Sequence, residues 1–165
     1  MAREYAPEGF TFVFVYTREA HPGEYYGPHR SMEQKLAHAR AFQERNRIER
    51  PILVDDLAGT GHRLYGALPN MTYILSRGGR ILFRSDWTDP PTIAMYLQYL
   101  LAVRQRRNAG ERLAGFYTEC VGYHNVDPVK FQQGLAQAGP QAVEDFARTM
   151  RRWNSQGKIP SRIEE

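Results

Sequence analysis

The fold is decided by the stretch from Gly9 to His29, which reads GFTFVFVYTREAHPGEYYGPH. Its first part, up to Tyr16, consists almost wholly of β-branched and aromatic residues. That composition predicts a strand buried on both faces, as in a parallel sheet under helices. The part after the strand gathers tyrosines, glutamates and histidines and contains no cysteine. This pattern predicts an active-site loop that works without a thiol.

Composition and charge indicate an ordinary globular protein. The chain has 165 residues, of which 42% are apolar and 24% charged, enough for one domain with a real core. The formal net charge is +4, but the basic residues are scattered. The arginine clusters at 104–107 and 148–152 fall where helices are expected to end, and cations there complement the helix dipole. We therefore expect no nucleic-acid partner.

The N-terminal sequence lacks the apolar core of a signal peptide, and no stretch approaches the length of a membrane span. Cys120 is the only cysteine, so neither an intramolecular disulfide nor a CxxC redox pair is expected. These features favour a cytoplasmic protein with no membrane partner.

Turn signals and apolar periodicity predict the order β-α-β-α-β-β-α, followed by a helical extension. Ser31 and Gln34 form a capping box at the start of the first helix, and paired glycines at 78–79 predict a hairpin. The expected elements are a strand at 9–16, a helix from 31 to about 48, a strand at 51–55, a short helix at 62–66, hairpin strands at 71–76 and 80–84, a helix that begins after Asp89, and two helices that begin at Pro128 and Pro140. We divide the chain into a domain at 1–107 and a helical extension at 108–165, packed on that domain or on a second subunit.

Three strings resemble the iodothyronine deiodinases, a branch of the thioredoxin-like superfamily, over about residues 9–102. They are VYTREAHP at 15–22, PILVD at 51–55 and YGALP at 65–69, which runs on to Tyr73 and Ile74. The resemblance implies a truncated thioredoxin-like α/β fold with a C-terminal helical extension. It also implies that Tyr16, Glu19 and His21 are active-site residues, with His29 as a second active-site histidine.

The resemblance also implies a role for the residues before the hairpin. Thioredoxin-like proteins carry a cis proline there, beside the active site, and Pro69 occupies that position. The alternative is a trans proline that starts a strand. In either case Asn70 is expected next to the pocket.

The chain departs from the deiodinases at the reacting centre. Members of that family place a strand and a helix before the first strand seen here, with the selenocysteine or cysteine at their junction. This sequence is expected to lack that unit, and Cys120 lies too far downstream to replace it. The family's arginine shortly before the tyrosine that matches Tyr73 is also replaced, around Asn70 and Met71. We therefore carry over the fold and the position of the pocket, but not reductive deiodination.

The loop suits proton transfer. In an extended segment Glu19 and His21 point to the same side, and a carboxylate beside an imidazole raises the pKa of that imidazole. We expect these two residues to be the acid–base pair and Tyr16 to donate a hydrogen bond. Tyr25 and Tyr26 are expected to line the pocket. The alternative is a rigid surface loop whose polar groups pair with one another.

Two other kinds of chemistry are less specific. His21 and His29, with Glu19, Glu24 or the aspartates at 55–56, supply the residue types of a metal site, but their spacing is not that of a known motif, so no metal or other cofactor is expected. His124 lies four residues after Cys120 and would activate its thiol on a common helix. The alternative is a buried structural cysteine. His38 and His62 are interpreted as surface or rim residues.

These observations predict a cofactor-independent acid–base enzyme, of the lyase, cyclase, isomerase or dehydratase type, that acts on a small aromatic or polyketide-like molecule. One alternative is a non-catalytic thioredoxin-like subunit that binds a partner. Another is thiol-dependent redox chemistry or reductive dehalogenation through Cys120. Because the missing first unit leaves a sheet face open, a homodimer or a hetero-complex is expected to cover that face.

Overall fold

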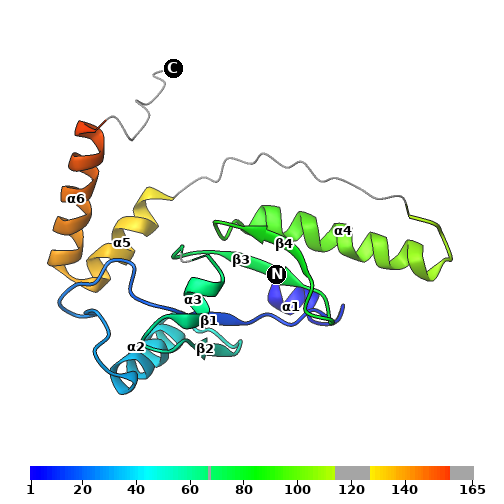
Figure 1. Ribbon diagram of the computed structural model, residues 1–165, viewed down its shortest axis with the longest axis horizontal. Helices are drawn as coiled ribbons and strands as arrows, with labels where there is room; N and C mark the ends of the chain where they lie inside the picture. Colours follow the sequence, from blue (N-terminus) through cyan, green and yellow to red (C-terminus); the bar gives the residue numbers. More distant parts are fainter. Residues whose placement is uncertain (67, 114–126, 157–165) are drawn as a thin grey trace.

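The computed structural model describes residues 1–66, 68–113 and 127–156. It is a mixed α/β structure, which confirms the predicted class (Figure 1). The helices are α1 (Ala2–Tyr5), α2 (Met32–Arg45), α3 (Thr60–Leu64), α4 (Pro90–Asn108), α5 (Pro128–Ala138) and α6 (Pro140–Ser155). The strands are β1 (Phe14–Tyr16), β2 (Ile52–Val54), β3 (Thr72–Leu75) and β4 (Ile81–Ser85).

The strands form two small sheets. β1 pairs with β2 in parallel, with Val15 opposite Leu53, and β3 pairs with β4 as an antiparallel hairpin. Within the described ranges each sheet has two strands. The order of elements from β1 to α4 is the predicted one. Two separate two-stranded sheets do not by themselves establish a thioredoxin-like fold, so that part of the expectation stays a prediction.

The prediction that the first strand is buried on both faces is wrong. Phe14 and Tyr16 pack against Phe42 of α2, with ring centroids 6.2 and 6.1 Å apart. On the opposite face, Val15 is 55% exposed and its neighbour Leu53 58% exposed. α2 therefore covers one face of the sheet, and no described helix or strand buries these two side chains on the other.

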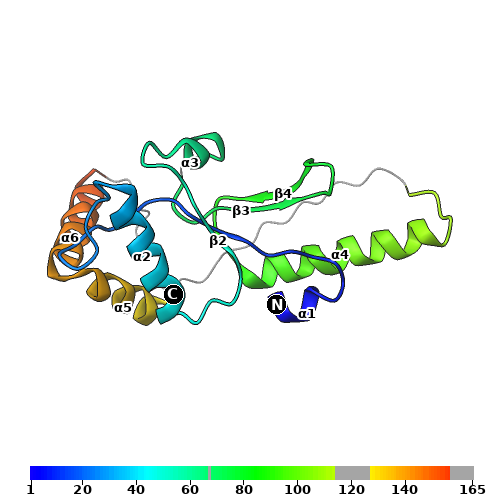
Figure 2. The ribbon, with the colours of Figure 1, turned by 90° about the horizontal axis from the view of Figure 1, so that it is seen from below.

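The core lies between the N-terminal segment and α4, which run beside each other (Figure 2). Tyr5, Ile93 and Leu97 are buried there, and Phe10 and Phe12 pack against them. Tyr5 belongs to α1, a short helix that the sequence pattern did not indicate. This packing explains why the apolar run from Gly9 is longer than β1: its first half contributes to the core rather than to strand pairing.

α2 begins as predicted and ends earlier. The Ser31 hydroxyl accepts a hydrogen bond from the Gln34 amide at 3.1 Å, and the Gln34 side chain accepts one from the Arg30 amide at 2.8 Å. The helix stops at Arg45 rather than near Ile48, and Arg47 takes a left-handed backbone conformation with φ of 49°.

Lys35 is the most buried side chain of α2, at 2% exposure. Its ammonium group donates a hydrogen bond to the Asp56 carbonyl at 2.8 Å. Burial lowers the pKa of Lys35, and the negative charges of Asp55 and Asp56 oppose that shift. The apolar stripe predicted for this helix is only partly buried, because Leu36 and Phe42 stay more than a third exposed. The hydrogen bond from Lys35 therefore links α2 to the segment that follows β2.

The turn after β2 is organised by Asp55. Its carboxylate accepts hydrogen bonds from the amides of Asp56, Gly61 and His62, each at 2.9 Å. Burial by itself would raise the pKa of Asp55, but the three N–H donors outweigh it and the net pKa is lowered. This arrangement starts α3.

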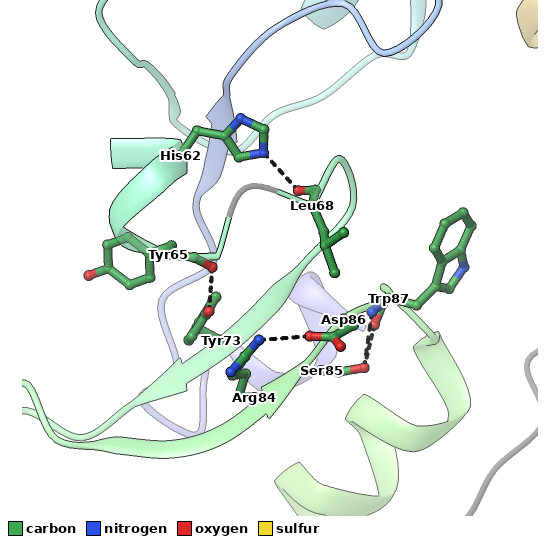
Figure 3. Close-up of polar contacts among 8 residues, drawn as sticks. All are labelled: His62, Tyr65, Leu68, Tyr73, Arg84, Ser85, Asp86 and Trp87. Carbon is green, nitrogen blue, oxygen red and sulfur yellow. Dashed lines mark hydrogen bonds and ion pairs between the residues drawn. The ribbon is translucent and has the colours of Figure 1, made fainter. Parts of the chain in front are cut away.

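His62 is buried rather than at a rim, which corrects the sequence interpretation. Its Nε2 lies 2.9 Å from the Leu68 carbonyl oxygen, in hydrogen-bond contact (Figure 3). The Tyr73 hydroxyl donates to the Tyr65 carbonyl oxygen in the same region (Figure 3). The peptide bonds among the described residues are all trans, including that of Pro69. Pro69 nevertheless does not start a strand, because it lies in a turn and β3 begins at Thr72.

α5 and α6 lie beside the loop that follows β1 (Figure 1). Gly139 separates the two helices, as predicted, and the Asp127 carboxylate caps α5 by accepting from the amides of Val129 and Lys130. None of the helices in the described part of the chain is both long and apolar enough to cross a membrane.

Replacing Lys35 by alanine should lower the free energy of unfolding by about 2–4 kcal/mol, because it empties a buried site and removes a donor from the Asp56 carbonyl. Lys35→Met keeps most of the volume and should cost less. Urea unfolding followed by circular dichroism measures both. The control is Lys130→Ala on exposed surface, expected to change stability by less than about 0.5 kcal/mol. An equal loss in the free energy of unfolding for Lys35→Ala and Lys130→Ala would contradict the role of Lys35 as an anchor of α2.

Candidate functional site

The candidate site begins where β1 ends, at Tyr16. The Tyr16 carbonyl oxygen accepts a hydrogen bond from the Asp55 amide at 3.1 Å, so the carboxyl ends of the two parallel strands meet here. The Tyr16 hydroxyl donates a hydrogen bond to Glu19 Oε1. Burial, and next this bond, raise the pKa of Tyr16 far above its usual range. The phenol therefore stays protonated and acts as a donor.

Two histidines face the same carboxylate oxygen. His29 Nε2 and His38 Nδ1 each lie 3.8 Å from Glu19 Oε1. The side chains of His29, His38 and Glu19 are 6%, 13% and 22% exposed. Both of these ring nitrogens are buried and have no hydrogen-bond partner. Burial lowers the pKa of His29, and the nearby positive charges of His38 and Lys35 lower it further. His29 is thus disposed to be neutral.

Helix α2 supplies the second histidine. His38 is one turn beyond Lys35, on the side of α2 that covers β1, and its ring lies 5.2 Å from that of His29 between centroids. The Tyr26 ring packs edge-on against His38 at 5.1 Å. Arg45 donates a hydrogen bond to the Tyr26 hydroxyl and holds it in place. Tyr26 therefore packs against the second histidine, while its predicted role in lining a pocket stays a prediction. We call Tyr16, Glu19, His29 and His38 the Glu–His cluster.

His21 is not in this cluster, and its predicted pairing with Glu19 is wrong. The His21 ring packs edge-on against Phe131 and Phe146, at 5.9 and 5.4 Å between centroids. Burial lowers the pKa of His21, the opposite of what a neighbouring carboxylate would do. Glu19 and His21 were expected to point to the same side, as alternate residues of a strand do. They do not, because this loop is not a regular extended strand. His21 anchors the loop to α5 and α6 instead.

The other predicted site residues lie elsewhere. Tyr25 has an exposed side chain, although its amide donates to the Ala138 carbonyl oxygen at 3.1 Å. Pro69 is exposed, and the Asn70 carbonyl oxygen accepts from the Thr88 hydroxyl at 3.3 Å, just before α4. Asn70 thus contacts the segment between β4 and α4, whereas the preceding Leu68 contacts His62 of α3 (Figure 3). Cys120 and His124 lie outside the described residues.

The helical extension holds the loop from its other side. A Cβ atom at Gly23 would clash with the Ala138 carbonyl group. The Glu24 carboxylate accepts from the Gln141 amide at 2.9 and 3.0 Å, at the start of α6. A hollow of about 190 Å³ opens beside this contact; it is lined by Ala20, His21, Pro22, Ala142, Asp145, Phe146, Thr149 and Trp153. The loop therefore has the Glu–His cluster on one side and a shallow apolar hollow on the other.

The residues that could hold a metal differ from the set suggested by the sequence. Glu19, His29 and His38 bring one possible ligand atom each to within 4.8 Å of one another. His38 had been interpreted as a surface or rim residue and was missed. A signal existed, because residues 35, 38 and 42 recur at helical spacing on the face of α2 that covers β1.

Comparison with known proteins does not assign a class. No family model matches the sequence, and no solved structure matches it. The site is therefore defined by its own geometry: a carboxylate and two buried imidazoles at the carboxyl end of a parallel strand pair.

Replacing Gly23 by alanine should loosen α5 and α6 from the loop, because the new methyl group needs the space of the Ala138 carbonyl. We expect a loss of about 1–3 kcal/mol of stability and faster hydrogen exchange at the Tyr25 amide, read by mass spectrometry. Gly27→Ala is the matched control, since its Cβ would meet the Gly23 oxygen at an ordinary 3.6 Å. Unchanged exchange at Tyr25 in Gly23→Ala would contradict this docking.

Proposed function

We propose that this protein is an acid–base enzyme that acts on a small molecule at the Glu–His cluster. The observation that carries the proposal is the surroundings of Glu19. Its carboxylate is held by the Tyr16 hydroxyl and faced by two buried imidazole nitrogens that lack partners. Buried polar groups without partners are costly in structural sites and recur in functional ones.

The distances suit a bound reacting group. The 3.8 Å between Glu19 Oε1 and each imidazole nitrogen is too long for a direct hydrogen bond. A substrate atom placed among them would be within reach of all three groups. Glu19 would accept a proton from the substrate, Tyr16 would hold the carboxylate in position, and His29 or His38 would exchange the proton with a second atom. This assignment replaces the pair of Glu19 and His21.

The position of Tyr16 at the end of β1 and the sequence resemblance to deiodinases support the same site. Open α/β sheets bind ligands at the carboxyl ends of their parallel strands, which is where Tyr16 lies. Tyr16, Glu19 and His29 are also among the residues that the resemblance to deiodinases singled out. Proton transfer, unlike deiodination, needs no thiolate. Lyase, cyclase, isomerase and dehydratase reactions all fit this chemistry, and the aromatic rings of Tyr16 and Tyr26 suit an aromatic or polyketide-like substrate.

The proposal is testable before the substrate is known. The full-length protein is incubated in D₂O with a library of small carbon acids and aromatic polyketides, and mass spectrometry detects deuterium uptake or loss of water. Glu19→Gln should slow the transfer by about 10²–10⁴-fold, the usual contribution of a general base.

The control is Glu44→Gln, which changes an exposed glutamate of α2 and should retain the full rate. Circular dichroism confirms that both variants are folded. Equal deuterium transfer by Glu19→Gln and the unmodified protein would contradict the assignment of Glu19.

A second candidate is a binding role for the uncovered sheet face. Val13, Val15 and Leu53 are 46%, 55% and 58% exposed. Because Val15 and Leu53 are paired across β1 and β2, they present one continuous apolar surface. Such surfaces are typical of contact sites. A second copy of the chain or a partner subunit would cover this face, with or without catalysis at the cluster.

Sedimentation velocity tests the second candidate. The unmodified chain should sediment as a dimer or larger species at micromolar concentration, and Val15→Glu should shift it to the monomer, because a carboxylate cannot be buried unpaired. Val129→Glu, at an equally exposed apolar site on α5, is the control and should not change the distribution. A monomeric unmodified chain would remove self-association from consideration.

A further inference from the structure

We propose that Glu19, His29 and His38 bind a divalent first-row transition-metal ion, such as Zn²⁺ or Fe²⁺. The inference uses the same cluster as the proposed function and names the ligand that the cluster would hold, so it rests on that site being functional. Its test reads metal binding, independently of turnover.

The geometry is close to that of a three-ligand centre. One ligand atom of each residue lies within 4.8 Å of the others, so a point exists no more than about 2.8 Å from all three. Zinc lies about 2.0–2.2 Å from imidazole nitrogen and carboxylate oxygen. Side-chain shifts of at most about 0.8 Å would close the site, which is within the reach of small rotations about the side-chain bonds.

The missing hydrogen bonds point to a cation. His29 Nε2 and His38 Nδ1 are buried and have no hydrogen-bond partner. The whole His29 side chain is only 6% exposed. When each ring carries its proton on the other nitrogen, two lone pairs lie within 4.8 Å of each other and of the Glu19 carboxylate. A trapped water could donate one proton to each imidazole nitrogen, but only a cation would also be attracted by the negative charge of Glu19, whose Oε1 already accepts from Tyr16.

The surrounding charges permit a cation. Lys35 is the nearby positive group that acts on His29. Its ammonium is bound to the Asp56 carbonyl oxygen and is itself influenced by the carboxylates of Asp55 and Asp56. These two negative charges offset the lysine, and Glu19 supplies a further one directly at the site.

The ligand set selects the type of metal. Two imidazoles and one carboxylate are the ligands of catalytic zinc sites and of non-haem iron(II) sites, both of which keep open positions. The Tyr16 hydroxyl bonded to Glu19 would orient the carboxylate, as outer hydrogen bonds do in metal sites. The open position would take water or a substrate oxygen, and a metal-bound water would lose a proton near neutral pH. With the ion bound, this water would replace the Glu19 carboxylate as the proton acceptor, and Glu19, His29 and His38 would act as ligands.

The experiment titrates the chelator-treated full-length protein with Zn²⁺ by calorimetry and with Co²⁺ by visible absorption. We expect one ion per chain, and a thermal midpoint raised by about 5 °C or more at zinc concentrations 100 times the dissociation constant. Glu19→Gln, His29→Gln and His38→Gln should each weaken binding about 100-fold or more. His21→Phe, a histidine change in the same loop but outside the cluster, is the control and should bind as the unmodified protein does.

Absence of stoichiometric binding by the unmodified protein would overturn the inference, and so would equal binding by all three ligand variants. If those variants do not fold, the histidine ring ¹⁵N spectrum of the unmodified protein decides. Zinc-dependent shifts at His29 Nε2 and His38 Nδ1 support the site, and unshifted signals overturn it.

The metal inference and the proposed function fail separately. Glu19-dependent deuterium transfer in a protein that binds no metal would remove the metal site alone. Metal binding together with equal transfer by Glu19→Gln would remove the assigned reaction alone.

Discussion

The contact between α2 and the end of the parallel strand pair is the constraint on which the candidate site depends. Lys35 reaches from α2 to the Asp56 carbonyl, and the Asp55 amide reaches from β2 to the Tyr16 carbonyl. These two links fix the helix, β2 and β1 relative to one another. His38 and Tyr16 therefore arrive at one place from elements that are distant in the sequence. A buried lysine is costly unless its ammonium is bonded, so the position of α2 is tightly specified.

The loop after β1, residues 17–31, is held on two sides. On the α2 side its Glu19 and His29 enter the Glu–His cluster. On the other side His21 packs against Phe131 and Phe146, so it lies outside the cluster and contacts α5 and α6. The polar residues of this loop thus divide between the Glu–His cluster, where we propose the chemistry, and the contact with α5 and α6. The histidines and tyrosines of the loop therefore do not all belong to one site.

Much of the fold could be predicted because its signals are local. The Ser31 cap, the hairpin glycines and the proline-led helices each depend on a few neighbouring residues. The site could be predicted only in part. The sequence analysis names Tyr16, Glu19 and His29 of the cluster but not His38, because the position of His38 depends on which face of α2 meets β1. The direction of His21 is set by Phe146, 125 positions away in the chain, and no local pattern carries such a contact. The exposure of one face of β1 could not be predicted either, because apolar residues occupy both faces of this strand.

The close approach of Gly23 to Ala138 has a consequence for communication within the molecule. The loop carries Glu19 and His29 of the cluster and also the docking contact for α5 and α6, so binding at the cluster and docking of these helices share one element. Thermodynamic linkage between binding at the cluster and docking of α5 and α6 would be reciprocal. A molecule that binds more tightly when the helices are docked must favour their docking by the same factor. The C-terminal helices contact both elements that carry the cluster, the loop at Gly23 and α2 through the hydrogen bond from Arg45 to Gln137, so a ligand that moved either element would alter their docking.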